Sequence, residues 1–442
     1  MQRTLIYKIL IIFVLALFLM IPLSMIRGTV HERQALHYNV VQGLAQTSTG
    51  SQIVAGPIFN VPYKKKIRNV SIDAKGKKTV TEHFETGTLE FLPDTLTIRG
   101  KLATQQRSRG IFKALIYDAE LGMGGYFDIP ANFGVTENVS DYQWGSAFLT
   151  IGISDIRGIK MLAVNFADET RKFKPGTNTP LVSAGVHTEL GQIDVAAARR
   201  LNYSVSAALQ GMQSIDFAPL GKHTRVEVAS SWPHPSFTGR YLPEHRQIGD
   251  KGFNAVWQTS HFATNMQQLV ANCATADCPA LRDNTLGVNL IEPVNIYLKA
   301  ERSLKYGFLF IALTFIAFFL FEVLKELRIH PIQYSLVGVA LALFYLLLIS
   351  LSEHLEFALS YAIAALACVA LLGFYVRYIL ASKARAFSFS ALLGVLYGLL
   401  YVLLQSEDYS LLVGALLLFV LLGLVMTLTR KIDWYRLGTE SK

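Results

Sequence analysis

The chain has 442 residues, of which 52% are hydrophobic and 17% are charged, and its formal net charge is +9. A mean hydropathy of +0.35 lies well above the soluble average and argues against an ordinary soluble protein. The positive charge does not indicate nucleic-acid binding. No basic stripe with interleaved aromatic residues occurs, and much of the excess lies at the N-terminus and between apolar segments.

The N-terminus predicts a membrane anchor. A short basic start with Arg3 and Lys8 precedes an almost wholly apolar run at residues 9–26. This run is longer than a typical signal-peptide core and no small-x-small cleavage site follows it, so we expect an uncleaved helix. Pro22 is expected to kink or end that helix. Apolar residues at near-helical spacing in 30–44 either continue the helix outward or lie on the membrane surface.

Residues 27–303 have the composition of a globular domain, and short alternating runs within them predict antiparallel strands in a sandwich-like, β-rich domain. The expected strands are residues 79–85, 88–92, 95–102, 110–118, 125–129, 147–153, 158–166, 202–209 and 224–230. Helices are expected at 195–201 and, on a weaker pattern, at 254–272. A final strand is expected within 284–300, and the lysine run at 64–66 is expected in a solvated loop or at a strand edge.

The C-terminal third of the chain is predicted to span a membrane. Five apolar segments follow one another, each about 20 residues long, which is the length a helix needs to cross a hydrocarbon core about 30 Å thick. The segments are residues 304–321, 332–351, 357–376, 387–404 and 411–429. Soluble core helices seldom occur five in a row at this length and apolarity, so we predict a bundle of membrane helices.

The charges between these segments test the prediction independently. Stretches with Lys or Arg, at 322–331, 377–386 and after 429, alternate with 352–356 and 405–410, which have none. The positive-inside rule then places both termini of a six-helix protein in the cytoplasm and the large domain in the periplasm of a bacterium. The predicted domains are an N-terminal anchor at 1–26, a periplasmic β-rich domain at 27–303, a five-helix bundle at 304–429 and a cytoplasmic tail at 430–442.

Two of the three cysteines lie close together in the predicted periplasmic domain. Cys273 and Cys278 are predicted to form a local disulfide if that domain is extracytoplasmic, with free thiols as the alternative. A zinc site would need two further ligands, and no nearby His/Cys pair supplies them, so no metal is predicted. Cys368 lies in the third C-terminal segment and is predicted to be a small packing residue.

The densest group of candidate binding residues is segment 231–237, with the sequence SWPHPSF. Prolines on both sides of His234 force an extended backbone that cannot occupy a central strand. The segment could present His234 and Ser236 to a ligand, or it could be a rigid loop anchored by Trp232 and Phe237. No adjacent carboxylate orients His234 and no elbow places a serine nucleophile, which favours the anchoring role.

Ionisable residues at the ends of the apolar segments form a second group. Glu353, His354, Glu407 and Asp408 fall on the predicted outer side, where such a cluster could bind a cation or dock the periplasmic domain. Glu322 falls on the inner side, roughly 30 Å away along a spanning helix, and cannot share a site with them. No charged residue lies near the middle of a segment, so interfacial anchoring and loop solvation are the simpler roles.

Signatures of common enzymes are missing from the sequence. It contains no Gly-x-Ser-x-Gly, no His-Glu-x-x-His and no phosphate-binding Gly-x-x-x-x-Gly-Lys-[Ser/Thr] motif. We therefore predict no catalytic residues, no cofactor and no enzymatic activity.

Several segments carry a family resemblance: residues 231–237, 330–334, 344–348 with 352–354, and 429–435, and more loosely 56–57 and 155–158. They resemble the CreD inner-membrane proteins, a cell-envelope integrity family of Gram-negative bacteria. The resemblance covers the chain from the anchor to Tyr435, and the pair of Cys273 and Cys278 lies outside its pattern. It implies an inner-membrane protein produced under a two-component system that responds to envelope stress, and it implies no catalytic residues.

These features together predict an envelope-integrity and stress-response protein of the inner membrane that acts through a periplasmic binding or scaffolding domain. The expected partners are the lipid bilayer and a periplasmic or envelope protein or glycan. The main alternative is a transporter or permease for a lipid or small solute. The other is a membrane enzyme acting on envelope glycan or lipid, with His234 or Glu353 as its acid or base.

Overall fold

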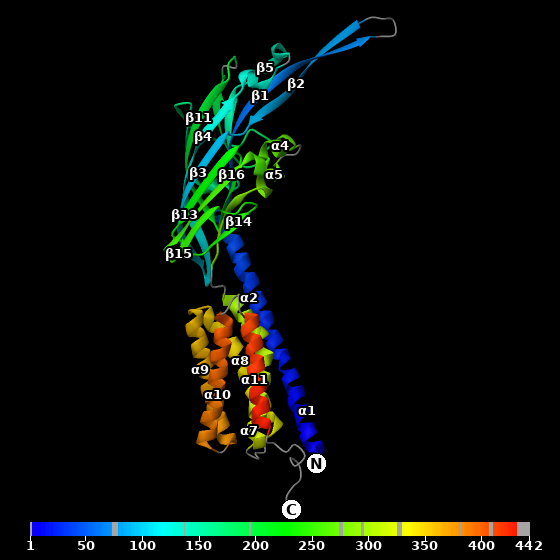
Figure 1. Cartoon of the computed structure of the whole chain (residues 1–442), viewed down its shortest axis with the longest axis vertical. Helices are drawn as coiled ribbons and strands as arrows, with labels where there is room; N and C mark the ends of the chain where they lie inside the picture. The colour runs from blue at the N-terminus through cyan, green and yellow to red at the C-terminus, as the bar shows by residue number, and fades with distance from the viewer. Residues whose placement is uncertain are drawn as a thin grey trace, which may run out of the picture. The chain divides into compact units, whose positions relative to one another are not determined.

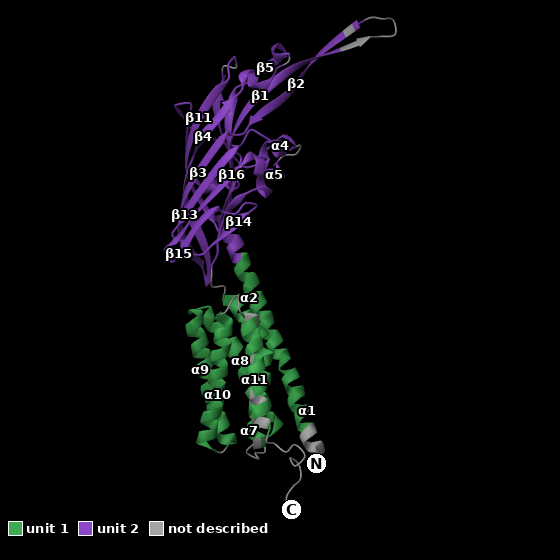
Figure 2. Ribbon diagram, viewed as in Figure 1, with its two compact units in different colours: residues 1–39, 294–442 green, residues 40–293 purple. Residues whose placement is uncertain are grey.

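The computed structural model describes residues 2–72, 78–136, 138–193, 196–273, 277–292, 296–324, 329–380, 382–405 and 410–430. The chain divides into two compact units, which Figure 2 shows in different colours. The helical unit comprises Met1–Asn39 and Val294–Lys442, and the β unit comprises Val40–Pro293.

Long helices make up the helical unit (Figure 1). Helix α2 belongs to both units, since its residues up to Asn39 lie in the helical unit and those from Val40 onward lie in the β unit (Figure 2). In chain order the described helices are α1 (Gln2–Phe18), α2 (Met20–Thr47), α6 (Ile296–Lys305), α7 (Gly307–Leu324), α8 (Pro331–Ser352), α9 (Phe357–Ile379), α10 (Lys383–Gln405) and α11 (Ser410–Thr429). Each of the five C-terminal apolar segments coincides with one of these helices to within a few residues.

Pro22 explains the break in the N-terminal helix. α1 ends at Phe18, four residues before Pro22. A proline ring crowds the carbonyl group four residues earlier and has no N–H to donate to it. The chain resumes as α2 at Met20 and stays helical to Thr47, so residues 30–44 continue the helix, which is one of the two predicted alternatives.

Four described helical stretches are long and apolar enough to cross a membrane, and a fifth is added if α6 and α7, which meet at 44°, form one broken span. The four are Tyr7–Thr47, Pro331–Ser352, Phe357–Ile379 and Lys383–Gln405. α11 has 20 residues and takes the place of the last predicted segment. Several helices of membrane-spanning length and apolarity are therefore present among the described residues, and the number six stays a prediction.

The expected final strand at 284–300 is only partly correct. Leu286–Leu290 forms strand β17, but Ile296–Lys305 forms helix α6. Three alternating apolar residues are too few to distinguish a strand from a helix. The buried residues of α6 include Tyr297 and Ala300, which recur at helical spacing on one face.

Aromatic side chains from different helices fill the interior of the helical unit. The rings of Phe344 on α8 and Phe310 on α7 each lie with their centroids 4.5 Å from that of Tyr397 on α10. Gly338 lets the side chain of Leu19 approach the backbone of α8 closely, because a Cβ at position 338 would lie 2.1 Å from Cδ1 of Leu19. Lipid is as apolar as these side chains, so close packing rather than exclusion from water holds such helices together.

The described part of the β unit contains two sheets. The nine-stranded sheet has the order β14-β17-β12-β1-β6-β10-β9, with β2 and β5 also paired to β1. Its strands are β1 (Gln52–Ile72), β2 (Lys78–Phe91), β5 (Tyr142–Trp144), β6 (Ala147–Ile153), β9 (Lys174–Pro175), β10 (Gly185–Gly191), β12 (Ser214–Ala218), β14 (Pro235–Gly239) and β17 (Leu286–Leu290).

The eight-stranded sheet has the order β15-β16-β13-β3-β4-β11-β7-β8. Its strands are β3 (Thr95–Arg109), β4 (Phe112–Ile129), β7 (Ile159–Phe166), β8 (Glu169–Arg171), β11 (Arg199–Met212), β13 (His223–Ser230), β15 (His245–Gly249) and β16 (Gly252–Ser260). Short helices complete the unit: the 3₁₀ turns Ala131–Gly134, Val139–Asp141 and Ile156–Gly158, and the α-helices α3 (His261–Thr264), α4 (Met266–Ala271) and α5 (Pro279–Asp283).

The two sheets share one hydrophobic core. Phe59 on β1 packs against Phe127 on β4 at 5.9 Å and stacks on Phe166 of β7 at 6.1 Å between ring centroids. Most neighbouring strands are antiparallel, as predicted, but the described pairs β1–β12 and β3–β13 are parallel. The β-rich region is therefore confirmed, whereas a sandwich arrangement stays a prediction.

Four of the predicted strands are joined in pairs into two longer strands. The predicted strands 79–85 and 88–92 are parts of β2, and 110–118 and 125–129 are parts of β4. Glycines such as Gly87 lie in the predicted gaps without ending the strand, because glycine also adopts the extended conformation.

The predicted helix at 195–201 is wrong where it overlaps a described strand, and the predicted helix at 254–272 is only partly correct. Residues 199–201 of the first, 195–201, open strand β11, where buried and exposed residues alternate. Residues 254–260 of the second, 254–272, belong to β16, and only its later part is helical, as α3 and α4. Pairing with neighbouring strands outweighs local helix preference at both places.

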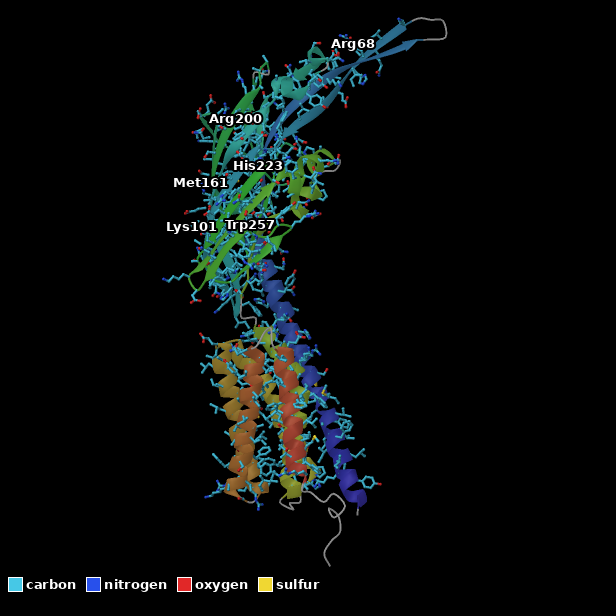
Figure 3. The ribbon with its side chains drawn as sticks, viewed as in Figure 1. Arg68, Lys101, Met161, Arg200, His223 and Trp257 are labelled. Atoms are coloured by element: carbon cyan, nitrogen blue, oxygen red, sulfur yellow. A yellow bond between two sulfur atoms is a disulfide. The ribbon has the colours of Figure 1, made fainter. Side chains whose placement is uncertain are left out.

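β1 and β2 form a two-stranded ribbon that extends beyond the sheets (Figure 1). β5 pairs with β1 only as far as Lys65, so from Lys66 onward β2 is the only described strand paired with β1. The lysine run at 64–66 therefore lies within a strand, and Lys66 Nζ lies 2.7 Å from Glu82. Figure 3 shows Arg68 on the same ribbon, where its Nε donates to Glu82 at 3.1 Å.

Candidate functional site

Segment 231–237 joins β13 to β14, and its aromatic residues hold it to the β unit. The indole N–H of Trp232 donates to the carbonyl oxygen of Ile291 at 2.9 Å. The ring of Phe237, on β14, packs edge-on against Trp257 at 5.6 Å between centroids; Trp257 is labelled in Figure 3. β14 lies at the edge of its sheet, where a proline-containing strand belongs. These contacts correspond to the anchoring role.

His234 and Ser236 are the polar candidates of this segment. His234 is exposed and its ring lies 6.1 Å from that of Trp232. Within the described ranges no carboxylate forms an ion pair with its imidazole. Ser236 pairs with Asn289 across β14 and β17 and is partly buried. A ligand site at these residues therefore stays a prediction.

A partly buried carboxyl group lies beside the segment. Asp216 on β12 accepts a hydrogen bond from Thr238 Oγ1 of β14 at 3.1 Å, across the intervening β17. Gly287 of β17 permits this contact, because a Cβ there would lie 2.4 Å from Oδ1 of Asp216. Burial raises the pKa of Asp216, and the hydrogen bond from Thr238 opposes that rise. The three residues come from three strands, so their spacing in the sequence gives no sign of the contact.

Glu353 lies where three helices of the helical unit meet. It caps the C-terminus of α8, and its side chain is 10% exposed. One carboxylate oxygen lies 3.6 Å from Nε of Arg33 on α2 and accepts from the hydroxyl of Tyr297 on α6 at 3.4 Å. Arg27, also on α2, pairs with Glu301 of α6 at 3.3 Å. Basic residues of α2 therefore face acidic residues of α6 and α8.

The predicted membrane-edge cluster is only partly placed. His354 follows Glu353 and is exposed. Glu407 and Asp408 lie outside the described residues, so a cluster of all four stays a prediction. The partners that Glu353 does have, Arg33 and Tyr297, were not among the predicted site residues.

Glu322, near the end of α7, is 6% exposed and accepts three hydrogen bonds. Its donors are the hydroxyl of Tyr334 at 2.8 Å, the backbone N–H of Ile329 at 3.1 Å and the ammonium group of Lys8 on α1. A buried carboxylate stays charged at tolerable cost only when it is paired and hydrogen-bonded in this way. This pair could not be predicted from local spacing, because 314 positions separate Lys8 from Glu322.

Asp155 and Arg157 form what we call the helix clamp, which holds the C-terminal end of α2 within the β unit. The guanidinium of Arg157 donates to the carbonyl oxygens of Ala45, at 3.2 Å, and Gln46. These carbonyls belong to the last turn of α2 and have no partner within the helix. Asp155 orients the guanidinium through hydrogen bonds of 2.8 and 2.6 Å and also accepts from the N–H of Gly50 at 3.0 Å.

Buried neighbours support the clamp. Gln52 is 0% exposed and donates to the carbonyl oxygens of Asp155 at 3.0 Å and Gln210 at 2.9 Å. A Cβ at Gly158 would lie 2.2 Å from the oxygen of Gln210, so the residue after Arg157 must be glycine. The Arg157 guanidinium holds the pKa of the Asp155 carboxyl below its usual value. These constraints give a physical reason for the Asp-x-Arg-Gly pattern at 155–158.

Cys273 and Cys278 are bonded to each other in the structure, with Cα atoms 5.6 Å apart, and Cys278 is 2% exposed. Cys368 is a free, buried thiol in α9 and accepts a hydrogen bond from the hydroxyl of Tyr397 at 3.1 Å. Within the part of the chain that the structure describes, no group of three or more His, Cys, Asp or Glu side chains could hold a metal ion.

Apolar helices of membrane-spanning length joined to a β-rich unit define a polytopic membrane protein. A family described as "Inner membrane protein CreD" matches residues 4–435. The inner membrane protein CreD of Escherichia coli (strain K12) is 32% identical over 443 residues, which cover 98% of this chain and 95% of that protein. The chain belongs to the CreD family of inner membrane proteins.

Among solved structures, an M1 zinc metallopeptidase from Deinococcus radiodurans aligns with 45% of this chain and 42% of its own. The identity is 9% and the TM-score is 0.19, which is too low to support a common fold or function.

We predict that Arg157→Ala loosens the end of α2. Without the guanidinium, the last carbonyls of the helix lose their donors and Asp155 loses its partner, so a protease should cut between residues 43 and 51 at least about threefold faster. The matched control is Arg200→Ala, which removes an exposed arginine with the same two-bond pairing, to Asp128, but caps no helix. Equal cleavage in both variants would contradict the clamp.

The same cleavage should depend on pH. The pKa of Asp155 is lowered from its ordinary 3.8 in the folded chain, so the stabilisation is present above about pH 4 and lost as pH falls through the lowered pKa. Acidification from about pH 5 to about pH 2 should therefore accelerate cleavage in the wild type, and less so in Asp155→Asn, which has no carboxylate to protonate.

We predict that Lys8→Met destabilises the helical unit, because it leaves the buried carboxylate of Glu322 without its cation. Breaking such a pair costs about 3 kcal/mol or more. Adding Glu322→Gln should restore part of the loss, since an amide oxygen still accepts from Tyr334 and carries no charge. Thermal unfolding of the detergent-solubilised chain measures both effects. Losses that simply add in the double variant would show that the two groups do not interact.

Proposed function

We propose that this CreD-family protein maintains the cell envelope through a binding or scaffolding domain in the periplasm. In this proposal α1 with α2, α6 with α7, and α8 to α11 give six spans, and the basic loops set both termini in the cytoplasm. The β unit then lies on the periplasmic side and contacts an envelope protein or glycan. Membership of an inner-membrane family supports the location, and the charge alternation supports the orientation.

The observation that carries the proposal is the helix clamp. α2 contributes to both units, and within the β unit Arg157 caps its last turn. Apolar contacts among Val41 of α2, Ile116 of β4 and Met212 of β11 add to that attachment. A domain joined to a membrane helix by hydrogen bonds and apolar packing is suited to a binding or scaffolding role in a membrane protein.

The polar sites described above support binding over catalysis. His234 has no orienting carboxylate among the described residues, and Glu353 is engaged by Arg33 and Tyr297. A general acid or base needs an oriented neighbour and a free face toward a substrate. Neither residue has that arrangement.

The bend between α6 and α7 favours a second candidate function, transport of a lipid or small solute. Broken helices line substrate sites in many transporters. The hydroxyl of Tyr345, which has no partner among the described residues, is buried beside this break, with its Cζ 3.3 Å from the position of a Cβ on Gly307. Solute flux by the purified chain in vesicles would support this candidate over a scaffold.

The orientation can be tested with a reporter enzyme that is active only outside the cytoplasm. Inserted after Gly110, in the exposed turn between β3 and β4, it should be active; inserted after Ser382, between α9 and α10, it should be inactive. The charge rule predicts opposite sides for these two positions. The reverse pattern would place the β unit inside and remove the physical basis of the proposal.

The function can be tested in cells that lack the chain, scored for growth on medium containing a membrane-disrupting detergent. A scaffold should tolerate His234→Ala and Glu353→Gln singly, but fail when the β unit is deleted. Arg157→Ala should impair growth, whereas Arg200→Ala should not. Loss of function in His234→Ala or Glu353→Gln at normal abundance would indicate an enzyme instead.

A further inference from the structure

A groove of about 400 Å³ lies between α8 and α9 of the helical unit. This volume falls in the range of sites that hold small molecules, about 300–1,000 Å³. Only Ser350 and Cys368 among its lining residues carry a polar group in the side chain. The lining residues are Ala340, Leu343, Phe344, Leu346, Leu347, Ser350, Ala364, Ala367, Cys368 and Leu371.

Buried residues form the base of the groove, and exposed leucines form its rim. Ala364 and Cys368 of α9 are buried, at 0% and 6% exposure. Leu343 on α8 and Leu371 on α9 are 51% and 57% exposed and stand on either side. The short side chains of Ala364 and Cys368 leave space beneath the exposed leucines.

We propose that the hydrocarbon chain of a membrane lipid occupies this groove. Both helices are apolar enough to span the membrane, and the family is one of inner membrane proteins, so the rim is continuous with the surface that contacts lipid. No lining residue is charged, which suits an uncharged chain and does not suit a polar solute. A chain in the groove gives the small residues the dispersion contacts that an unfilled groove lacks.

The groove also has a direction. Ser350 is the lining residue nearest the C-terminal end of α8, which stops at Ser352. At the opposite end the lining is wholly apolar, with Ala340 and Leu371. The polar head of the lipid is therefore expected at the Ser350 end and the methyl end of its chain at Ala340.

Intact-protein mass spectrometry of the full chain, purified in detergent, tests the proposal. The wild type should retain an adduct with the mass of a membrane lipid. Ala367→Phe fills the groove and should reduce the adduct about tenfold, which corresponds to about 1.4 kcal/mol of binding free energy. Ala362→Phe is the matched control: it makes the same change at an exposed alanine of α9 outside the groove and should keep the adduct.

A second measurement leaves the groove's small residues unchanged, in case Ala367→Phe does not fold. A photoreactive benzoyl-phenylalanine is placed at Leu347, which lines the groove, or at Leu336, which is 50% exposed on α8 outside it. After purification in detergent, lipid should cross-link at position 347 and not at 336. A wild type without a lipid adduct, equal cross-linking at both positions, or cross-linking of position 347 to a second copy of the chain would each overturn the proposal.

Discussion

Backbone carbonyls at the end of a helix need donors, and the attachment of α2 to the β unit depends on how that need is met. Arg157 supplies the donors for Ala45 and Gln46, and Asp155 fixes the direction of the guanidinium. The buried amide of Gln52 supports the clamp by donating to the carbonyl oxygens of Asp155 and Gln210. Gly158 is also required, because any side chain there would clash with the carbonyl oxygen of Gln210. A short polar motif on a turn thereby holds the helix that belongs to both units.

In the described part of the helical unit, the two shielded carboxylates, Glu322 and Glu353, both have partners. Glu322 is buried but accepts from Lys8, Tyr334 and the backbone, while Glu353 accepts from Tyr297 and lies near Arg33. Between these groups, aromatic and small side chains fill the interior. In a hydrocarbon environment an unpaired charge is costly. These hydrogen-bonded and ion-paired carboxylates therefore connect neighbouring helices.

Most of the polar candidate residues of the β unit are also engaged in contacts within the unit. Segment 231–237 is fastened by Trp232 and Phe237, and the nearby Asp216 has its own donor in Thr238. His234 is exposed on this part of the unit, next to the sheet edge at β14. An exposed ring next to a strand edge is suited to contact with another molecule, which agrees with a binding role more than with an enclosed active site.

The sequence alone determined the parts of this protein that follow from local composition. The apolar segments of about 20 residues form helices at the predicted positions, because the backbone groups of a helix make their hydrogen bonds within the segment itself. Alternating residues gave β-structure in the middle of the chain, and the motif at 155–158 marked the position of the clamp without revealing what it holds.

Only the tertiary structure decided which distant residues meet. Lys8 with Glu322, Arg33 with Glu353 and Arg157 with the end of α2 are joined across long stretches of chain, and spacing in a sequence carries no record of such contacts. The wrong helix at 195–201 and the joined strands of β2 and β4 have the same cause. A strand's extent is set by hydrogen bonds to a neighbour elsewhere in the chain, whereas a helix makes its hydrogen bonds to itself.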